Sequence, residues 1–170
     1  MFNKYDLSCK YRLTIILEKS GKKYSDAEKI EMAERKNGYY KEKIKVITSK
    51  DMLKGAYDFI IKVKKLGIKV AIGSSSKNTM AILDRIECVD LFDAIVDGND
   101  IKNSKPAPDV FLKAAEKLEI EPEDCMVVED ADAGVEAALA AGMDVLAVGY
   151  ASKNPKATYS AKGLFEYLVM

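Results

Sequence analysis

The amino-acid sequence predicts an α/β fold, in which a parallel sheet carries helices on both faces and follows a mostly helical region. After residue 67, short apolar runs alternate with segments of helical periodicity, which is typical of parallel strands joined by crossover helices. Gly67 and Gly142 each directly follow a segment of helical periodicity, at a position where glycine commonly ends a helix. A chain of 170 residues is long enough for one sizeable core with a small appendage.

The first part of the chain is expected to be a helical unit, because it is dense in Lys, Glu, Ile, Leu and Tyr. Ser25 and Glu28 have the spacing of a capping box, which favours a helix running from there toward Lys43. A second helix is expected over residues 53–66. We therefore divide the chain into a helical fragment and an α/β core, which cover residues 1–52 and 53–170.

The core is expected to alternate strands with helices. The expected strands cover residues 68–72, 94–96, 126–128 and 145–148, and the expected helices cover residues 77–87, 108–118 and 132–141. The run at 126–128 is apolar throughout, which favours a strand buried on both faces. A last amphipathic segment, residues 164–168, is expected to pack on the edge of this core.

Composition excludes several classes of function. Lys and Arg number 27, as do Asp and Glu, and no long basic block suggests a nucleic-acid partner. No apolar stretch is long enough to span a membrane. The three cysteines are far apart, which fits reduced thiols in a cytoplasmic protein. Because the chain has no histidine, any catalysis must use carboxylates, lysines, hydroxyls or a metal.

A serine-rich segment, residues 73–78, connects an expected strand directly to an expected helix. Its hydroxyls and backbone N–H groups suit an anion, because a helix N-terminus offers unpaired donors and the positive end of the helix dipole. The alternative is that these serines only cap the helix.

Two further groups of charged residues follow along the chain. Lys105 lies in a loop stiffened by Pro106 and Pro108, where its charge could meet a phosphate; the alternative is an ordinary surface lysine. Glu129 and Asp130 follow an expected strand, at the edge where α/β sheets bind ligands. Two carboxylates there suit Mg²⁺. The alternative is that an acid at this point, Asp130 or Asp132, caps the next helix.

In this order the three motifs resemble the second, third and fourth motifs of the haloacid dehalogenase (HAD) superfamily, and within it the β-phosphoglucomutase-like phosphatases and mutases. The matching segments are SSSKN at 74–78, SKPAPDVF at 104–111 and EDADAGVEAA at 129–138. The resemblance covers about residues 8–150. It implies a HAD-like Rossmannoid parallel sheet preceded by a helical cap fragment.

The resemblance also implies roles for single residues. Ser74 would hold the transferring phosphoryl group, Lys105 would neutralise its charge, and Glu129 with Asp130 would hold Mg²⁺. The implied substrate-binding residues are Lys36, Ser75, Ser76, Lys77 and Asn78. The implied reaction converts β-glucose 1-phosphate to glucose 6-phosphate. The alternatives are a small-molecule phosphatase and a non-catalytic subunit that binds a sugar phosphate or a partner.

The sequence departs from the family in two places. The family's first motif, an apolar strand ending in D-x-D-G with the nucleophilic Asp, is absent ahead of the cap. We therefore expect a truncated or decayed, inactive member, whose sheet lacks the strand between those at 126–128 and 70–72. Cys9 falls where the family has a substrate-clamping arginine; Lys10 or Arg12 could substitute for it, although the ammonium of a lysine does not replace a planar guanidinium fork.

Overall fold

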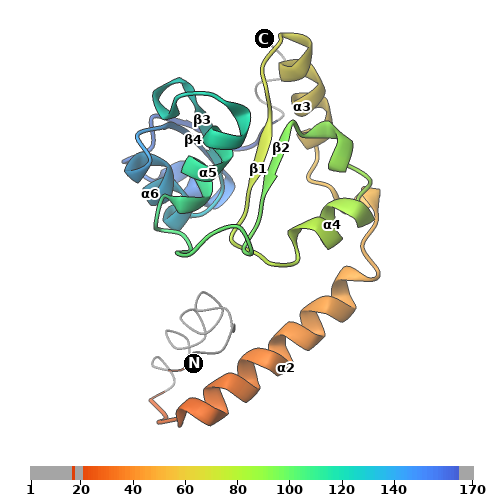
Figure 1. The fold of residues 1–170 in the computed structure, drawn as a ribbon, viewed down its shortest axis with the longest axis vertical. Coiled ribbons are helices and arrows are strands. Elements are labelled where there is room, and N and C mark those ends of the chain that lie inside the picture. Colours follow the sequence, from red (N-terminus) through yellow and green to blue (C-terminus); the bar gives the residue numbers. More distant parts are fainter. Residues whose placement is uncertain (1–16, 18–20, 165–170) are drawn as a thin grey trace. The chain divides into compact units, whose positions relative to one another are not determined.

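The computed structural model describes residue 17 and residues 21–164, and it divides the chain into two compact units (Figure 1). The units are Met1–Ile47 and Thr48–Met170, so the division falls slightly before the boundary that the sequence predicts. Cys9, Lys10 and Arg12 lie outside the described residues, as does the expected segment beyond residue 164.

The first unit contains helix α2, Asp26–Ile44. Its capping box is formed as predicted. The Ser25 amide donates to Glu28 Oε2 at 2.7 Å, and the Glu28 amide donates to Ser25 Oγ at 3.3 Å. These two bonds satisfy donors that every helix N-terminus leaves unpaired, which fixes where α2 begins.

The second unit opens with the 3₁₀ turn η1, Ser49–Asp51, and helix α3, Ala56–Lys65. Helix α3 starts later than the sequence predicts, because Gly55 before it adopts a left-handed conformation with φ of 82°. At the other end, Gly67 has a φ of 78° and its amide donates to the Lys64 carbonyl at 2.9 Å. Gly67 therefore ends α3 as the sequence predicts.

All strand pairs of the second unit are parallel, but the strands form two sheets. Strand β1, Ala71–Gly73, pairs with β2, Ala94–Val96. Strand β4, Asp144–Val148, lies between β3, Met126–Glu129, and β5, Tyr159–Ala161. All four predicted strands are therefore present, although the first begins at Ala71 and not at residue 68. The sequence does not indicate β5, because Tyr159–Ala161 is short and not a run of apolar residues.

Helices and 3₁₀ turns connect these strands. They are α4 (Thr79–Arg85), η2 (Val89–Leu91), α5 (Asp109–Leu118), η3 (Pro122–Asp124), α6 (Asp132–Ala140) and η4 (Gly149–Lys153). Helix α5 packs on β1 and β2, α6 packs on β3 and β4, and the two helices contact each other (Figure 1). This confirms the predicted α/β class. Among the described residues, no helix is long and apolar enough to cross a membrane.

Strand β3 is not buried on both faces, contrary to the prediction. Val127 is buried, but Met126 is 53% exposed and Val128 is 39% exposed. The side chains of β3 alternate between two faces: Val127 belongs to the hydrophobic core, whereas Met126 and Val128 lie on the other, more exposed face. Strand β4 instead buries three consecutive residues, Val145, Leu146 and Ala147, so both of its faces are covered.

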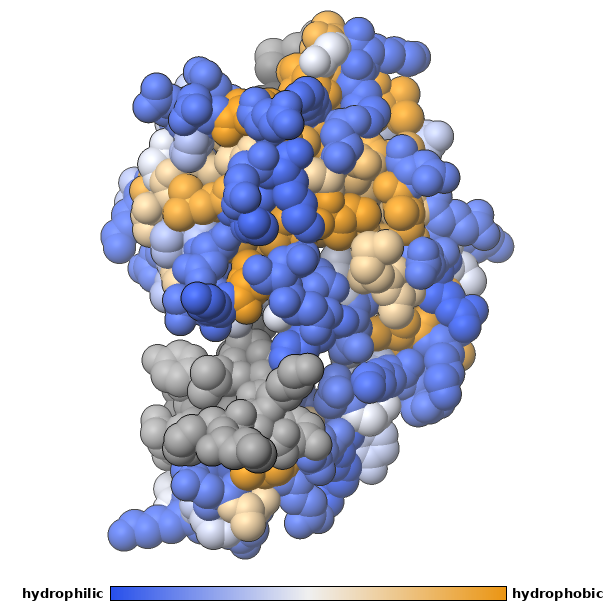
Figure 2. Space-filling model, in the orientation of Figure 1, coloured by the Kyte–Doolittle hydropathy of each residue, from blue (hydrophilic) through white to orange (hydrophobic). Residues whose placement is uncertain are grey.

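The core of the second unit lies between β4, α5 and α6. Val96, Val110, Val135 and Val145 are completely buried in it. The surface of this unit also carries apolar side chains, as the orange areas of Figure 2 show. Cys88 and Cys125 are free thiols, and burial raises the pKa of each.

Candidate functional site

The serine-rich loop continues β1 beyond Gly73 and folds on itself. The Ser74 amide donates to the Val96 carbonyl at 3.0 Å, which extends the contact between β1 and β2. Ser74 Oγ accepts the Ser76 amide, and Ser76 Oγ accepts the Asn78 amide, both at 3.2 Å. Asn78, at the N-cap of α4, makes no side-chain capping bond. The serines therefore shape the turn ahead of α4 and do not cap it directly.

The loop after β2 supports the serine loop from one side. The Gly98 amide donates to the Ser76 carbonyl at 3.1 Å. A Cβ at position 98 would lie 2.6 Å from the Ser75 carbonyl oxygen and 3.0 Å from the Lys77 amide nitrogen. Only glycine therefore allows the two loops to lie this close.

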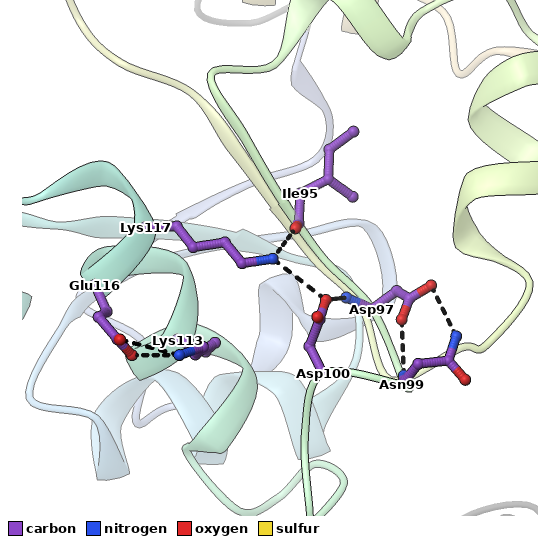
Figure 3. A network of polar contacts seen from close by, with 7 residues as sticks. All are labelled: Ile95, Asp97, Asn99, Asp100, Lys113, Glu116 and Lys117. Carbon is purple, nitrogen blue, oxygen red and sulfur yellow. Dashed lines mark hydrogen bonds and ion pairs between the residues drawn. The ribbon is translucent and has the colours of Figure 1, made fainter.

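Polar contacts fix the conformation of this supporting loop (Figure 3). Asp97, which is 8% exposed, accepts the Asn99 amide at 2.7 Å and donates its own amide to Asp100 at 2.9 Å. The bond from the Asp97 amide, followed by the charge of Lys117, lowers the pKa of Asp100. Lys117 also donates to the Ile95 carbonyl at 2.8 Å and so joins α5 to β2.

Lys105 is held in place by contacts with two other motifs. Its backbone N–H donates to Ser75 Oγ at 3.3 Å, and its Nζ lies 2.7 Å from Glu129 Oε2. The Lys105 side chain is 14% exposed and that of Glu129 is 10% exposed. Asn103, two residues earlier, closes the loop by donating its backbone and side-chain N–H groups to Asp109 in the first turn of α5. Lys105 is therefore not an ordinary surface lysine.

Glu129 uses both carboxylate oxygens. Oε2 receives the Lys105 ammonium, while Oε1 accepts the amides of Asp130 at 3.1 Å and Ala131 at 3.2 Å. Helix α6 has Ala131 at its N-cap with no side-chain capping bond, so the alternative that Asp130 or Asp132 caps this helix is wrong. Asp132 instead accepts a hydrogen bond from Asn154 at 2.8 Å.

Gly134 makes room for the Glu129 side chain. A Cβ at position 134 would lie 2.0 Å from the Glu129 carboxyl carbon and 2.1 Å from Oε2. Glu129 therefore folds back over the first turn of α6, in a space that any side chain at position 134 would fill. The structure therefore gives the reason for a glycine at this position.

The structure joins three of the predicted site residues directly, namely Ser75, Lys105 and Glu129. Ser74 and Ser76 belong to the same loop as Ser75, Lys77 is exposed, and Asn78 is half-buried. Asp130 follows Glu129 and is exposed. Lys36 lies on α2 in the first unit. Which of these residues act on a substrate stays a prediction.

Sequence reasoning missed Asp97 and Gly98, which support the serine loop. A signal was present: an Asp-Gly pair follows the strand at 94–96 directly, where a turn is expected, at the same sheet edge as the serine motif. It also missed the position of Phe111, whose ring lies 4.4 Å from Lys105 Nζ, centroid to nitrogen.

The carboxylates fit Mg²⁺ in chemical type but form only part of a site. Within residues 21–164, no three His, Cys, Asp or Glu side chains gather closely enough to hold a metal ion. Mg²⁺ commonly takes one or two protein carboxylates and completes its shell with water and phosphate oxygens. Asp130 and Glu129 would be those carboxylates, and Glu129 would share its charge between the ion and Lys105.

A family model described as haloacid dehalogenase-like hydrolase matches residues 8–148. The match covers most of the chain, including all three motifs. The chain therefore belongs to the haloacid dehalogenase-like hydrolase family, as the motif order predicts.

Within this family the chain is similar to β-phosphoglucomutases and sugar-phosphate phosphatases. It is 42% identical to the Bacillus subtilis beta-phosphoglucomutase over 127 residues, 75% of this chain and 56% of that protein. It is 44% identical over 79 residues to the Escherichia coli fructose-1-phosphate phosphatase YqaB, 46% of this chain and 42% of that protein. The chain thus spans roughly half the length of these relatives.

A solved structure supports the same likeness. The beta-phosphoglucomutase of Clostridium difficile superimposes with a TM-score of 0.84 at 39% sequence identity, covering 96% of this chain and 76% of that one. A hydrolase from Pseudomonas syringae, at 21% identity and a TM-score of 0.77, shares the fold.

Proposed function

We propose that the chain forms the phosphate-binding part of a β-phosphoglucomutase-like enzyme, which transfers a phosphoryl group on a sugar phosphate with the help of Mg²⁺. One observation carries the proposal: Lys105 contacts Ser75 of one motif and Glu129 of another, through hydrogen bonds of 3.3 and 2.7 Å. Three sequence motifs that are far apart in the chain therefore meet at one residue, Lys105, whose backbone N–H contacts Ser75 and whose ammonium group contacts Glu129.

Each residue at this site has a role that its chemistry allows. The Lys105 ammonium would neutralise a phosphate, and the Ser74 hydroxyl would bind the group being transferred. Glu129 and Asp130 would hold Mg²⁺, which supplies positive charge to the phosphoryl oxygens when bound. Lys36 and the segment Ser75, Ser76, Lys77 and Asn78 would bind the rest of the substrate, including a second phosphate.

We further propose that the first unit acts as the cap and the second as the core, and that the core accepts one more strand. Within the described residues, β1 pairs only with β2, and β3 pairs only with β4, so each has an edge without a strand partner. A strand that ends in the family's D-x-D-G would fit between these edges and supply the nucleophilic carboxylate. Glu129 is a poor substitute, because Lys105 and two amides already engage its oxygens.

The phosphate site can be tested by titrating inorganic phosphate into the 170-residue chain in a calorimeter. We expect weak binding by the wild type and binding at least about tenfold weaker for Lys105→Ala, because a charged hydrogen bond is lost. Lys113→Ala is the matched control, since Lys113 forms an ion pair with the exposed Glu116 on its own helix, and this variant should bind phosphate as the wild type does. Equal binding by wild type and Lys105→Ala would contradict the proposal.

The expectation that this chain has no nucleophile is tested separately. With Mg²⁺ and β-glucose 1-phosphate, we expect no turnover and no acyl-phosphate from this chain. Turnover that survives both Asp130→Ala and Lys105→Ala would refute the site itself. Turnover that either change abolishes would show that another group of this chain serves as the nucleophile.

A small-molecule phosphatase is the second candidate, and the match to the E. coli fructose-1-phosphate phosphatase favours it. The two candidates differ in the fate of the phosphoryl group, which goes to water in a phosphatase and to the sugar in a mutase. Release of inorganic phosphate by a version of the chain that carries the nucleophile strand would select the phosphatase. Phosphate binding with no reaction in that version would instead favour the non-catalytic binding subunit.

A further inference from the structure

We propose that Phe111 is a positioning residue that holds the Lys105 ammonium over its ring. Lys105 Nζ lies 4.4 Å from the centre of the Phe111 ring, within the range of an attractive cation–π contact. The same Nζ lies 2.7 Å from Glu129 Oε2. The claim that this contact improves phosphate binding rests on the proposed function. The claim that Phe111 positions Lys105 does not.

The ring itself is fixed. Phe111 lies in the first turn of α5, is 7% exposed, and belongs to the hydrophobic core. Its edge passes close to the end of β1: a Cβ at Gly73 would lie 2.9 Å from Phe111 Cδ1 and 3.1 Å from Cε1. The absence of a side chain at Gly73 therefore lets the ring lie against the last residue of β1, where Lys105 Nζ lies over its face.

An aromatic ring holds an ammonium without using a strong hydrogen-bond acceptor. Lys117, on helix α5, is held by hydrogen-bond acceptors instead of a ring. Its Nζ lies 2.8 Å from the Ile95 carbonyl and 3.4 Å from Asp100. Among the described residues, Lys105 Nζ contacts one carboxylate and the ring face, so its remaining N–H donors stay available for a phosphate. The ring also limits the conformations of a long, flexible side chain.

The decisive experiment changes the charge of the ring face and leaves its shape nearly unchanged. Phe111 is replaced site-specifically by 4-fluoro-, 3,5-difluoro- and 3,4,5-trifluorophenylalanine, which withdraw electron density stepwise from the ring. Calorimetry with inorganic phosphate should show a Kd that rises with each fluorine, by about three- to tenfold over the series. The matched control is the same series at Phe92, a half-buried ring after η2, where Kd should not change. A Kd that is constant across the Phe111 series would overturn the proposal.

A second measurement needs no phosphate. In the phosphate-free wild type, NMR should find the chemical shift of the Lys105 ε-methylene protons moved upfield by the ring. In Phe111→Leu these protons should have the ordinary chemical shift of a lysine. In Phe111→Tyr, which restores an aromatic ring, their chemical shift should again lie upfield. Ordinary shifts in the wild type would refute the positioning role whether or not phosphate binds. If the wild type binds no phosphate but its Lys105 is shifted, the proposed function fails and the role of Phe111 stands.

Discussion

Glu129 occupies the space that a side chain at Gly134 would need. The carboxyl carbon of Glu129 would be 2.0 Å from a Cβ at position 134, far inside any van der Waals contact. Position 134 is helical, so a glycine there lowers helix propensity. A glycine is needed at this position because the Glu129 carboxylate fills the space of a side chain.

We therefore expect Gly134→Ala to destabilise the chain even though alanine favours helices. The new methyl group must displace Glu129, which breaks its ion pair with Lys105, and we expect a loss of about 1–3 kcal/mol in the free energy of unfolding. Urea denaturation measures this loss. Gly38→Ala in α2 is the control, because a Cβ there meets no atom within 4 Å, and it should leave stability unchanged or raise it by up to about 1 kcal/mol. A loss for Gly38→Ala equal to that for Gly134→Ala would remove the steric explanation.

The Lys105 and Glu129 side chains should be coupled energetically. Lys105→Met leaves a nearly buried carboxylate with only its two amide partners, and we expect it to cost about 1–3 kcal/mol. Adding Glu129→Gln should recover part of that loss, because the amide carries no charge and still accepts a hydrogen bond. A double-mutant cycle by urea denaturation gives the coupling energy.

The pair formed by Lys113 and Glu116 serves as the reference for this cycle. Its side chains are 40% and 68% exposed, and exposed pairs of this kind contribute about 0–0.5 kcal/mol. If the two cycles give the same coupling energy, the ion pair at the site is no stronger than a surface contact.

Asp93 should make stability depend on acidity. The hydrogen bond from Lys64, at 2.8 Å, and then that from the Val70 amide, at 2.7 Å, lower the pKa of Asp93 in the folded chain. A lowered pKa stabilises the fold at pH values above the unfolded pKa of about 3.9, and this stabilisation is lost as the pH falls through the folded pKa.

Thermal melts at a series of pH values test this dependence. Asp93→Asn should melt below the wild type at pH 7, and the difference should shrink as the pH falls below about 4. In a Lys64→Met background the difference at pH 7 should be smaller than in the wild-type background, because the largest cause of the pKa shift is gone while the Val70 amide bond remains. A difference that stays constant down to the acid end of the series would contradict the assignment.

A chain extended by an apolar strand ending in D-x-D-G should melt several degrees higher than the 170-residue chain, because the strand would pair with the open edges of β1 and β3. It should also acquire Mg²⁺-dependent activity on a sugar phosphate. The matched control carries N-x-N-G in place of D-x-D-G, and should gain the stability without the activity. An extended chain that melts no higher and stays inactive would favour decay of the core or a non-catalytic role, and Cys9, in the expected cap fragment, would be the first position to examine.

Local patterns in the sequence predict most of the fold. The capping box at Ser25 and the C-terminal glycine at Gly67 both depend on residues within one turn, and both are confirmed. Strand β5 and the exposed face of β3 could not be predicted in this way. Burial of a strand's side chains depends on what packs against each face of the sheet, and this information is not contained in the strand's own residues.

The candidate site shows the same limit. Motif order identifies Lys105 and Glu129 separately, and the structure adds that the two side chains form one ion pair across 24 positions of sequence. The support that Phe111 and Gly98 give to the motifs also depends on tertiary contacts. The residues that position a functional side chain are therefore difficult to predict from a single sequence.

The division of the strands into two sheets has a consequence for the way the second unit opens. Strand β4 is bonded along both edges and buried, whereas β1 and β3 each have an unpaired edge among the described residues. Amide protons of β4 should therefore exchange with deuterium only when the three-stranded half unfolds as a whole. Those of β1 and β2 should exchange earlier, as a separate cooperative unit of lower stability. The part of the molecule that carries the serine loop would then be the part that fluctuates first.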